Sequence, residues 1–170
     1  MPTPDFILNL RKKIGHEPLW LIGVTAYLED SHGRILFERR ADNGMWALVS
    51  GINEPGEDPA VTVAREMREE AGIDVDVTEL AAVKADPQVL TYPNGDQCQY
   101  LDLLFICELR DASDAGNARV SDDENLELGW FEPDRLPDPV TASSLARMDL
   151  ARKFLARRDG GNPRTLFETA

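Results

Sequence analysis

Hydrophobic and polar positions along the chain follow two different periods, which predicts a mixed α/β protein. Three segments have the spacing or end signals of helices: 5–14, 59–71 and 141–158. Runs rich in apolar and β-forming residues predict strands: 20–28, 35–37, 46–49, 75–84, 88–92, 97–109 and 126–131. Strands precede and follow the central helix, so the pattern is typical of a single α/β domain.

Turn residues indicate where the chain reverses. The residues at 30–33, which end in Gly33, predict a β-hairpin between the first two strands, and Asn94-Gly95 predicts a second one. Segment 111–124 is acidic and poor in apolar residues, so we expect a loop. We expect one domain over residues 1–158 and a flexible tail over 159–170, which contains Gly-Gly and Pro.

Composition and charge narrow the function. The chain has 170 residues, 42% of them hydrophobic, and carries 18 basic against 31 acidic residues, a net charge of −13. Such a surface repels phosphate backbones, so we expect no nucleic-acid partner. No apolar run approaches the roughly 18 residues of a membrane span and no signal-peptide layout precedes the domain, so we expect a cytoplasmic protein without membrane contact. A small anionic substrate stays possible if the site brings its own cations.

The cysteines and histidines do not suggest a redox or covalent site. Cys98 and Cys107 lie nine residues apart in one expected strand, about 30 Å at 3.3 Å per residue, whereas a disulfide needs Cα atoms within about 7 Å. We therefore expect both to be packing residues. His16 and His32 show no ligand spacing, and neither is expected to be catalytic.

The helix at 59–71 has clear end signals. Asp58 can cap it, Pro59 suits its first position, and Gly72 suits the left-handed position after its end. At about 100° per residue, four residues form a narrow stripe that we expect to face the core: Ala60, Ala64, Met67 and Ala71.

Three glutamates are expected on the opposite side of this helix: Glu66, Glu69 and Glu70. The i,i+4 pair of Glu66 and Glu70 disfavours the helix by a few tenths of a kcal/mol, and a nearby divalent cation would reverse that effect. Mg²⁺ takes oxygen ligands from carboxylates, and Glu57 could reach the same site. The alternative is a solvated acidic face, which charge counts alone favour in a chain with 31 acidic residues.

The spacing of residues 51–73 favours the metal site. The pattern is Gly, five residues, Glu, seven residues, Arg-Glu, an apolar residue, any residue, Glu-Glu, any residue, Gly and an apolar residue. It is filled by Gly51, Glu57, Arg65, Glu66, Met67, Glu69, Glu70, Gly72 and Ile73. This complete pattern resembles the box of the Nudix hydrolase family, and the resemblance extends to about residues 24–137. One departure is Val49-Ser50, where relatives often have Pro-Gly.

The resemblance implies a Nudix-type α/β/α sandwich around a mixed β-sheet. It implies Mg²⁺ or Mn²⁺ ligands at Glu66, Glu69, Glu70 and Glu57. Arg65 would orient Glu57 or neighbouring carboxylates, and Gly51 would offer backbone near the metal and phosphates. The general base is open between Glu69 and a loop acid, for which we favour Glu124 among residues 122–124. Arg39 or Arg40 would hold a substrate phosphate, the alternative being ordinary surface arginines.

The activity implied is metal-dependent cleavage of a diphosphate linkage by water attack at phosphorus. Candidate substrates are ADP-ribose, other nucleotide sugars, dinucleotides and (deoxy)nucleoside triphosphates. An alternative is a catalytically silent Nudix-like domain that senses a nucleotide and regulates a partner. Isomerisation of an isoprenoid diphosphate and RNA decapping are minor alternatives, the latter disfavoured by the charge of −13. A homodimer is an expectation from the family only.

Overall fold

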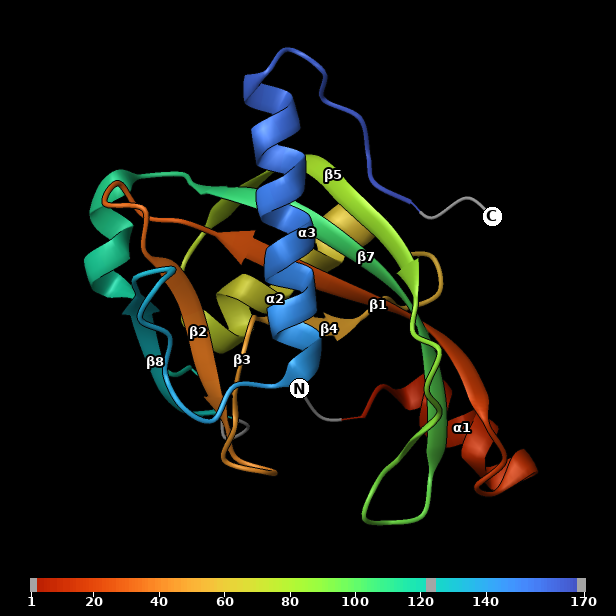
Figure 1. Ribbon diagram of the computed structural model, residues 1–170. Helices are drawn as coiled ribbons and strands as arrows, with labels where there is room; N and C mark the ends of the chain where they lie inside the picture. Colours follow the sequence, from red (N-terminus) through yellow and green to blue (C-terminus); the bar gives the residue numbers. More distant parts are fainter. Residues whose placement is uncertain (1–2, 122–124, 168–170) are drawn as a thin grey trace.

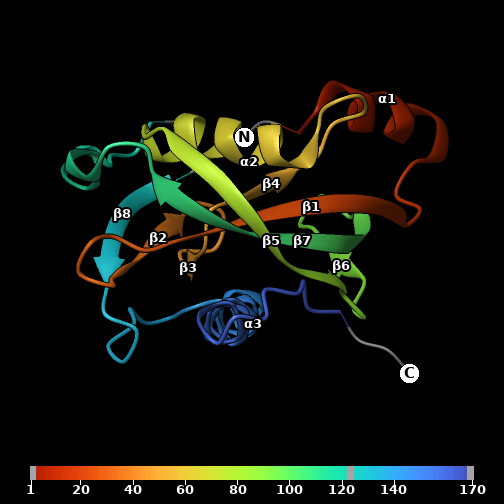
Figure 2. The ribbon, with the colours of Figure 1, turned by 90° about the horizontal axis from the view of Figure 1, so that it is seen from above.

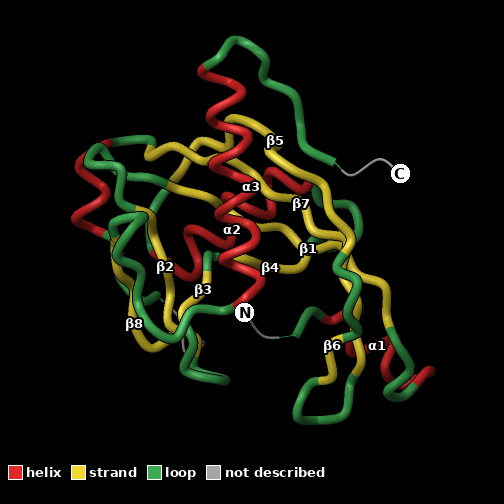
Figure 3. The backbone as a smooth tube through the Cα atoms, in the orientation of Figure 1, coloured by secondary structure: helices red, strands yellow, loops and turns green. Residues whose placement is uncertain are grey.

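A computed structural model describes residues 3–121 and 125–167. Its helices are α1 (Asp5–Ile14), α2 (Pro59–Ala71), α3 (Ala142–Asp159) and the 3₁₀ helix η1 (Ala112–Asn117). Its strands are β1 (Leu19–Leu28), β2 (Ile35–Arg40), β3 (Trp46–Ala47), β4 (Ser50–Ile52), β5 (Val75–Ala85), β6 (Leu90–Thr91), β7 (Gln97–Leu109) and β8 (Asn125–Phe131). Figure 3 shows these elements along the backbone.

Two sheets form the middle of the molecule. The larger has the order β4-β1-β7-β5, with β6 paired to β7, and the smaller has the order β3-β2-β8. The central strands β1 and β7 run parallel, and the other pairs are antiparallel. Helix α2 covers one face and α3 the opposite face (Figures 1 and 2). The predicted α/β/α sandwich around a mixed sheet is confirmed.

The core has one part on each face of the sheets. The part between α2 and the sheets includes Val24, Leu36 and Phe105 with Val63, Met67 and Ala71 of the helix. The part between α3 and the sheets includes Tyr27, Phe37 and Leu48 with Met148, Ala151 and Phe154 of the helix. Successive side chains of β2 alternate between these two parts, with Leu36 on the α2 side and Phe37 on the α3 side. The same alternation directs Glu38 toward the α2 side.

The first predicted hairpin is wrong. β1 and β2 lie in different sheets, and the chain between them makes an isolated antiparallel bridge between Glu29 and Ile35. The turn signal at 30–33 is real, since Asp30 accepts hydrogen bonds from the backbone N–H groups of His32 and Arg34. A turn reverses the chain without fixing the pairing, and β7, far away in sequence, takes the place beside β1. The second hairpin is confirmed, with β6 antiparallel to β7 around Gly95.

Two further segments differ from the sequence prediction. The expected strand at 46–49 is shorter than predicted, because only β3 at 46–47 is strand, in the smaller sheet; the chain then forms β4 in the larger sheet, beyond the predicted range. Part of the segment expected as a loose tail lies against β5, where Leu166 donates to the carbonyl of Ala81 and accepts from the N–H of Val83. Both differences come from pairings between distant residues.

Helix α2 has the predicted bounds. Gly72 adopts the left-handed conformation at φ 67°, as expected. Asp58 is the N-cap residue, but within the described residues its side chain makes no capping hydrogen bond. Cys98 and Cys107 are buried and free, as predicted. Over 3–121 and 125–167, no helix is both long and apolar enough to cross a membrane.

Candidate active site

The carboxylates of α2 do not share one exposed face. Glu66 and Glu70 are buried, with 1% and 4% of their surfaces exposed, whereas about half of the Glu69 side chain is exposed. The buried face of α2 is therefore wider than the predicted apolar stripe. The helix lies against the sheet through two adjacent rows of residues: Thr62, Val63, Glu66, Met67, Glu70 and Ala71. Two of the predicted ligands thus point into the molecule.

Arg65 holds three of the predicted site residues together. Its Nε and Nη2 donate to the two carboxylate oxygens of Glu57, both at 3.0 Å. Its Nη1 donates to Glu69 at 3.0 Å and to Glu66 at 3.2 Å. A guanidinium offers planar, paired donors that match a carboxylate in this way. Hydrogen bonds to Glu57 are the main cause of the raised pKa of Arg65.

Glu57 is held from a second side by residues outside the fixed positions of the box. The Thr62 hydroxyl donates to Glu57 Oε2 at 2.8 Å and accepts from Asn53 Nδ2 at 2.7 Å. The same Asn53 nitrogen donates to the backbone carbonyl of Glu57 at 3.0 Å. Hydrogen bonds from Arg65, and then from Thr62, lower the pKa of Glu57 against the opposing effect of burial. Its carboxylate is therefore held ionised and in one orientation.

Glu66 occupies a space that only a glycine leaves open. Gly51, on β4, faces α2, and a Cβ atom at this position would overlap the Glu66 carboxylate. Glu66 Oε2 is buried and has no hydrogen-bond partner among the described residues. Burial, and then the charge of Glu70, raise the pKa of Glu66 to about 8. A group that binds and neutralises this carboxylate would relieve both effects.

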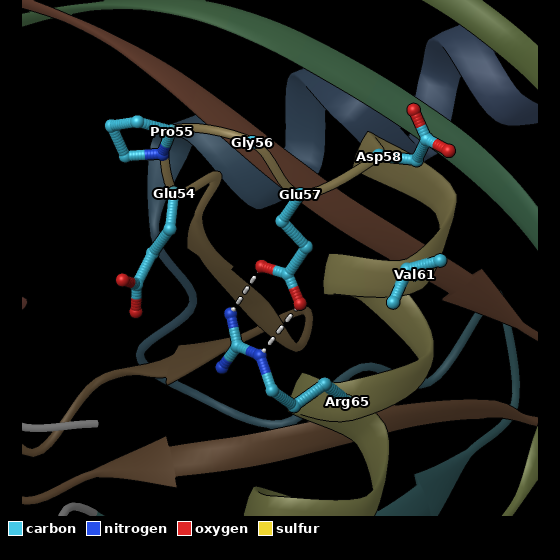
Figure 4. A pocket seen from close by; sticks show the side chains of 7 residues that line it. All are labelled: Glu54, Pro55, Gly56, Glu57, Asp58, Val61 and Arg65. Carbon is cyan, nitrogen blue, oxygen red and sulfur yellow. Dashed lines mark hydrogen bonds and ion pairs between the residues drawn. The ribbon is translucent and has the colours of Figure 1, made fainter.

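A cavity of about 590 Å³ opens beside this cluster. It is lined by Glu54, Pro55, Gly56, Glu57, Asp58, Val61 and Arg65. In Figure 4 dashed lines join the Glu57 carboxylate directly to the Arg65 guanidinium, while the Asp58 carboxylate points away from them. The cavity is thus bounded by the loop that precedes α2 and by the first turns of that helix.

The two predicted phosphate-binding arginines differ. Arg40 makes a bidentate pair with Asp42, and its pKa is raised mainly by those hydrogen bonds and further by the charges of Glu38 and Glu70. Arg40 therefore lies near the α2 carboxylates. Arg39 alternates to the other face of β2, where it lies 3.7 Å from Glu127 and donates to a loop carbonyl. The structure brings Arg40, and not Arg39, toward the cluster.

Two buried polar residues near α2 were not expected from the sequence. Glu38, 1% exposed, follows two residues after Leu36 on the face of β2 that packs under α2. Asn125, 7% exposed, begins β8 opposite Arg40. Glu38 directly follows the apolar residues 35–37 and continues the alternation from Leu36, which was a usable signal. Asn125 depends on a pairing irregularity that no local pattern shows. The expected base Glu124 lies outside the described residues.

The donor set fits a hard divalent cation. Within 3–121 and 125–167, no three acidic side chains converge as a finished metal site, and Arg65 bridges the carboxylates instead. Yet all candidate ligands are carboxylate oxygens, the type that Mg²⁺ and Mn²⁺ prefer. The unpartnered Glu66 Oε2, in the space left by Gly51, is an observation that such an ion would explain.

Comparison with known proteins agrees with this geometry. The NUDIX domain family model matches residues 20–150. A MutT-like protein of Streptomyces ambofaciens is 34% identical over 147 residues, which are 84% of this chain and 86% of that protein. The NAD-capped RNA hydrolase NudC of Stutzerimonas stutzeri is 35% identical over 118 residues, 69% of this chain but only 37% of that enzyme.

A solved structure has the same architecture. The MutT NUDIX hydrolase from Burkholderia pseudomallei superposes with a TM-score of 0.64 at 26% identity, covering 78% of this chain and 98% of that one. Residues 51–73 carry the complete box, and its arginine and glutamates meet at α2. The chain therefore belongs to the Nudix hydrolase family, as a pyrophosphohydrolase.

Proposed function

We propose that the chain hydrolyses the diphosphate linkage of a nucleoside diphosphate derivative, with Mg²⁺ or Mn²⁺ as cofactor. The candidates are ADP-ribose, another nucleotide sugar, a dinucleotide or a (deoxy)nucleoside triphosphate. The observation that carries the proposal is that Arg65 joins Glu57 to Glu69 and to the buried Glu66, whose pKa is raised in part by the charge of buried Glu70. The activity named for the relative NudC, hydrolysis of NAD-capped RNA, supports a nucleotide-derived substrate.

The chain's own residues have separate parts in this proposal. Glu66, Glu69, Glu70 and Glu57 would hold the cation. Such an ion, when bound, neutralises charge on phosphoryl oxygens and acidifies the attacking water. Arg65 fixes the orientation of the carboxylates, and Gly51 leaves room for Glu66. Glu124, or else Glu69, would accept the proton of the water.

Electrostatics explain how an acidic protein would accept an anion. With a net charge of −13, the surface as a whole repels phosphates. The carboxylate cluster reverses this locally, because it is the type of site that concentrates divalent cations. Arg40 adds a positive charge near Glu70, although Asp42 now pairs with it. A phosphate at Arg40 would have to compete with that pair.

A substrate panel tests the proposal. ADP-ribose, nucleotide sugars, dinucleotides and nucleoside triphosphates are incubated with Mg²⁺ and then with Mn²⁺, and products are separated by chromatography. We expect Glu69→Gln and Glu70→Gln to lower turnover by about a hundredfold or more, since even the outer partners of metal ligands account for about 10–100-fold. Both variants should keep the circular dichroism spectrum of the parent chain.

Glu108→Gln is the matched control, because it removes one negative charge from an exposed position on β7. It should retain full turnover. Parent-level turnover in both Glu69→Gln and Glu70→Gln would contradict the assignment of the cluster. Binding of a nucleotide without product, by folded and metal-loaded protein, would instead favour the silent sensor. The homodimer stays a prediction, which light scattering would test.

A further inference from the structure

Strand β8 departs from regular pairing where it begins. β2 and β8 pair one residue to one until Arg40, which pairs with Asn125, so that Leu126 is the extra residue of a β-bulge. Without this shift Leu126 would stand opposite Arg40 and continue the inward row of Leu128 and Trp130, which pack against the core beneath α2. Leu126 is instead 58% exposed, and Asn125 is buried.

The buried amide that results is not satisfied. Asn125 is 7% exposed, and its Nδ2 has no hydrogen-bond partner in the part of the chain that the structure describes. Burying an amide without a partner opposes folding, and so does exposing a leucine that could be buried. β-Bulges are frequent beside active sites, where they redirect a side chain. A ligand that accepts a hydrogen bond from Asn125 would compensate for both unfavourable effects of the bulge.

One pairing and two neighbouring features relate Asn125 to the candidate site. It stands opposite Arg40, whose pKa responds to the charge of Glu70. Ser121, four residues before Asn125, donates its backbone N–H to the carbonyl of Glu70 near the end of α2. Glu38, two residues before Arg40, is directed to the same face. Asn125 thus stands with Arg40 and Glu38 on the side of β2 and β8 that faces α2.

We propose that Asn125 binds the substrate, donating from Nδ2 to an anionic phosphate oxygen of the nucleotide. The chemistry of this ligand rests on the function proposed above. A buried N–H donor requires an acceptor, and a phosphate brought to the carboxylate cluster supplies several oxygens. Asn125 would then be a binding residue outside the box, uncovered by the bulge. Its cost to the free protein is repaid only in the complex.

The test replaces the amide by an apolar group of the same size. Asn125→Leu and the parent chain are titrated by calorimetry with α,β-methylene-ADP and Mg²⁺, a nucleotide whose P–C–P link resists hydrolysis. We expect about tenfold weaker binding, because a hydrogen bond to a charged group is lost. We also expect the melting temperature of the ligand-free protein to rise by about 2–4 °C, since the unsatisfied group is gone.

Further variants keep the proposal falsifiable. Leu126→Ala, at the exposed neighbour, should leave the dissociation constant unchanged. Asn125→Asp keeps the size of the side chain but exchanges the donor for a charge, so it should weaken binding more than Asn125→Leu. Unchanged affinity in Asn125→Leu and Asn125→Asp, or a parent chain that binds no α,β-methylene-ADP, would overturn the proposal.

The hydrolase proposal can fail separately. If the parent chain binds α,β-methylene-ADP through Asn125 yet cleaves no nucleotide of the panel, the binding role stands and the hydrolase role does not. If the parent chain cleaves a nucleotide and Asn125→Leu leaves its KM unchanged, only the role of Asn125 is lost.

Discussion

Two buried polar clusters lie on opposite faces of the same sheets, and they differ in how their groups are paired. On the α3 face, Asp102 accepts from Thr25 at 3.0 Å and from Arg147 at 2.8 Å, one bond to each carboxylate oxygen. On the α2 face, Glu66 Oε2 and Asn125 Nδ2 have no hydrogen-bond partner among the described residues.

This difference separates the α3 cluster, which we regard as structural, from the α2 cluster, for which we proposed a function. Burial alone does not, because Asp102 and Glu66 are both nearly inaccessible. A buried polar group whose atoms are all paired needs nothing further, whereas a buried polar atom without a hydrogen-bond partner destabilises the free protein. The α2 face has such unpartnered atoms. It also has the β-bulge in β8 and the Glu66 carboxylate packed directly against Gly51. Incomplete pairing is thus the feature by which we assign ligand binding, as proposed above, to the α2 face.

The largest expected effect comes from breaking the paired cluster. Arg147→Met leaves Asp102 buried with Thr25 as its remaining partner, and removal of one member of a buried ion pair costs about 3 kcal/mol. Urea unfolding would measure this loss of stability. Turnover of the folded protein at low temperature should stay within about twofold of the parent, because no atom of this cluster belongs to the α2 face.

The double variant Asp102→Leu with Arg147→Met is the control. Replacing both partners removes the uncompensated charge, so most of the lost stability should return. If Arg147→Met instead lowered turnover without lowering stability, the α3 cluster would have to be regarded as part of the active site.

A smaller effect is expected from the support of Glu57 on the α2 face. Thr62→Val keeps the shape of the side chain but removes the hydroxyl between Glu57 and Asn53. Because outer partners of metal ligands contribute about 10–100-fold, we expect turnover to fall about tenfold and the Mg²⁺ concentration for half-maximal rate to rise. The readout is a Mg²⁺ titration of the rate.

Thr62→Ser is the matched comparison, since it restores the hydroxyl and should recover most of the Mg²⁺ dependence. A Thr62→Val protein that loses stability but keeps the parent Mg²⁺ dependence would show that this hydroxyl is structural only, like the groups around Asp102.

Local signals in the sequence predicted the helix and the residues of the candidate site, but not how deeply those residues are buried. Asp58, Pro59 and Gly72 act within one turn of the helix, so the bounds of α2 could be predicted. The spacing of the box likewise predicted that Arg65 orients Glu57, and the two side chains are hydrogen-bonded. Whether Glu66 points outward or inward depends on how far α2 sinks toward β4, a contact of distant segments that a helical wheel does not contain.

Pairing between distant strands limited what else could be predicted from the sequence. The turn after β1 has the expected hydrogen bonds, yet β1 takes β7 as its partner and β2 takes β8. Asn125 faces inward only because of the bulge opposite Arg40, and the alternation of apolar residues in β8 would have directed Leu126 there. In both places the local sequence allows more than one register, and the other strand decides between them.

The smallest effect concerns a buried carboxylate that is well paired. Burial acts to raise the pKa of Asp30, but hydrogen bonds from the Arg34 side chain and from the backbone of Arg34 and His32 outweigh it, and the pKa is lowered. The pKa of Glu66, also buried, moves the other way. Because the folded form of Asp30 holds its proton less tightly than the unfolded form, its stabilising effect is present above the ordinary value of 3.8 and is lost as the pH falls through the lower folded pKa.

Asp30→Asn should therefore lower the free energy of unfolding by about 1 kcal/mol at pH 7 and at pH 5, and the difference from the parent should shrink below about pH 4. Urea unfolding at pH 7, 5 and 3.5 would measure it, and a difference that does not change over this range would show that the Asp30 charge does not stabilise the turn.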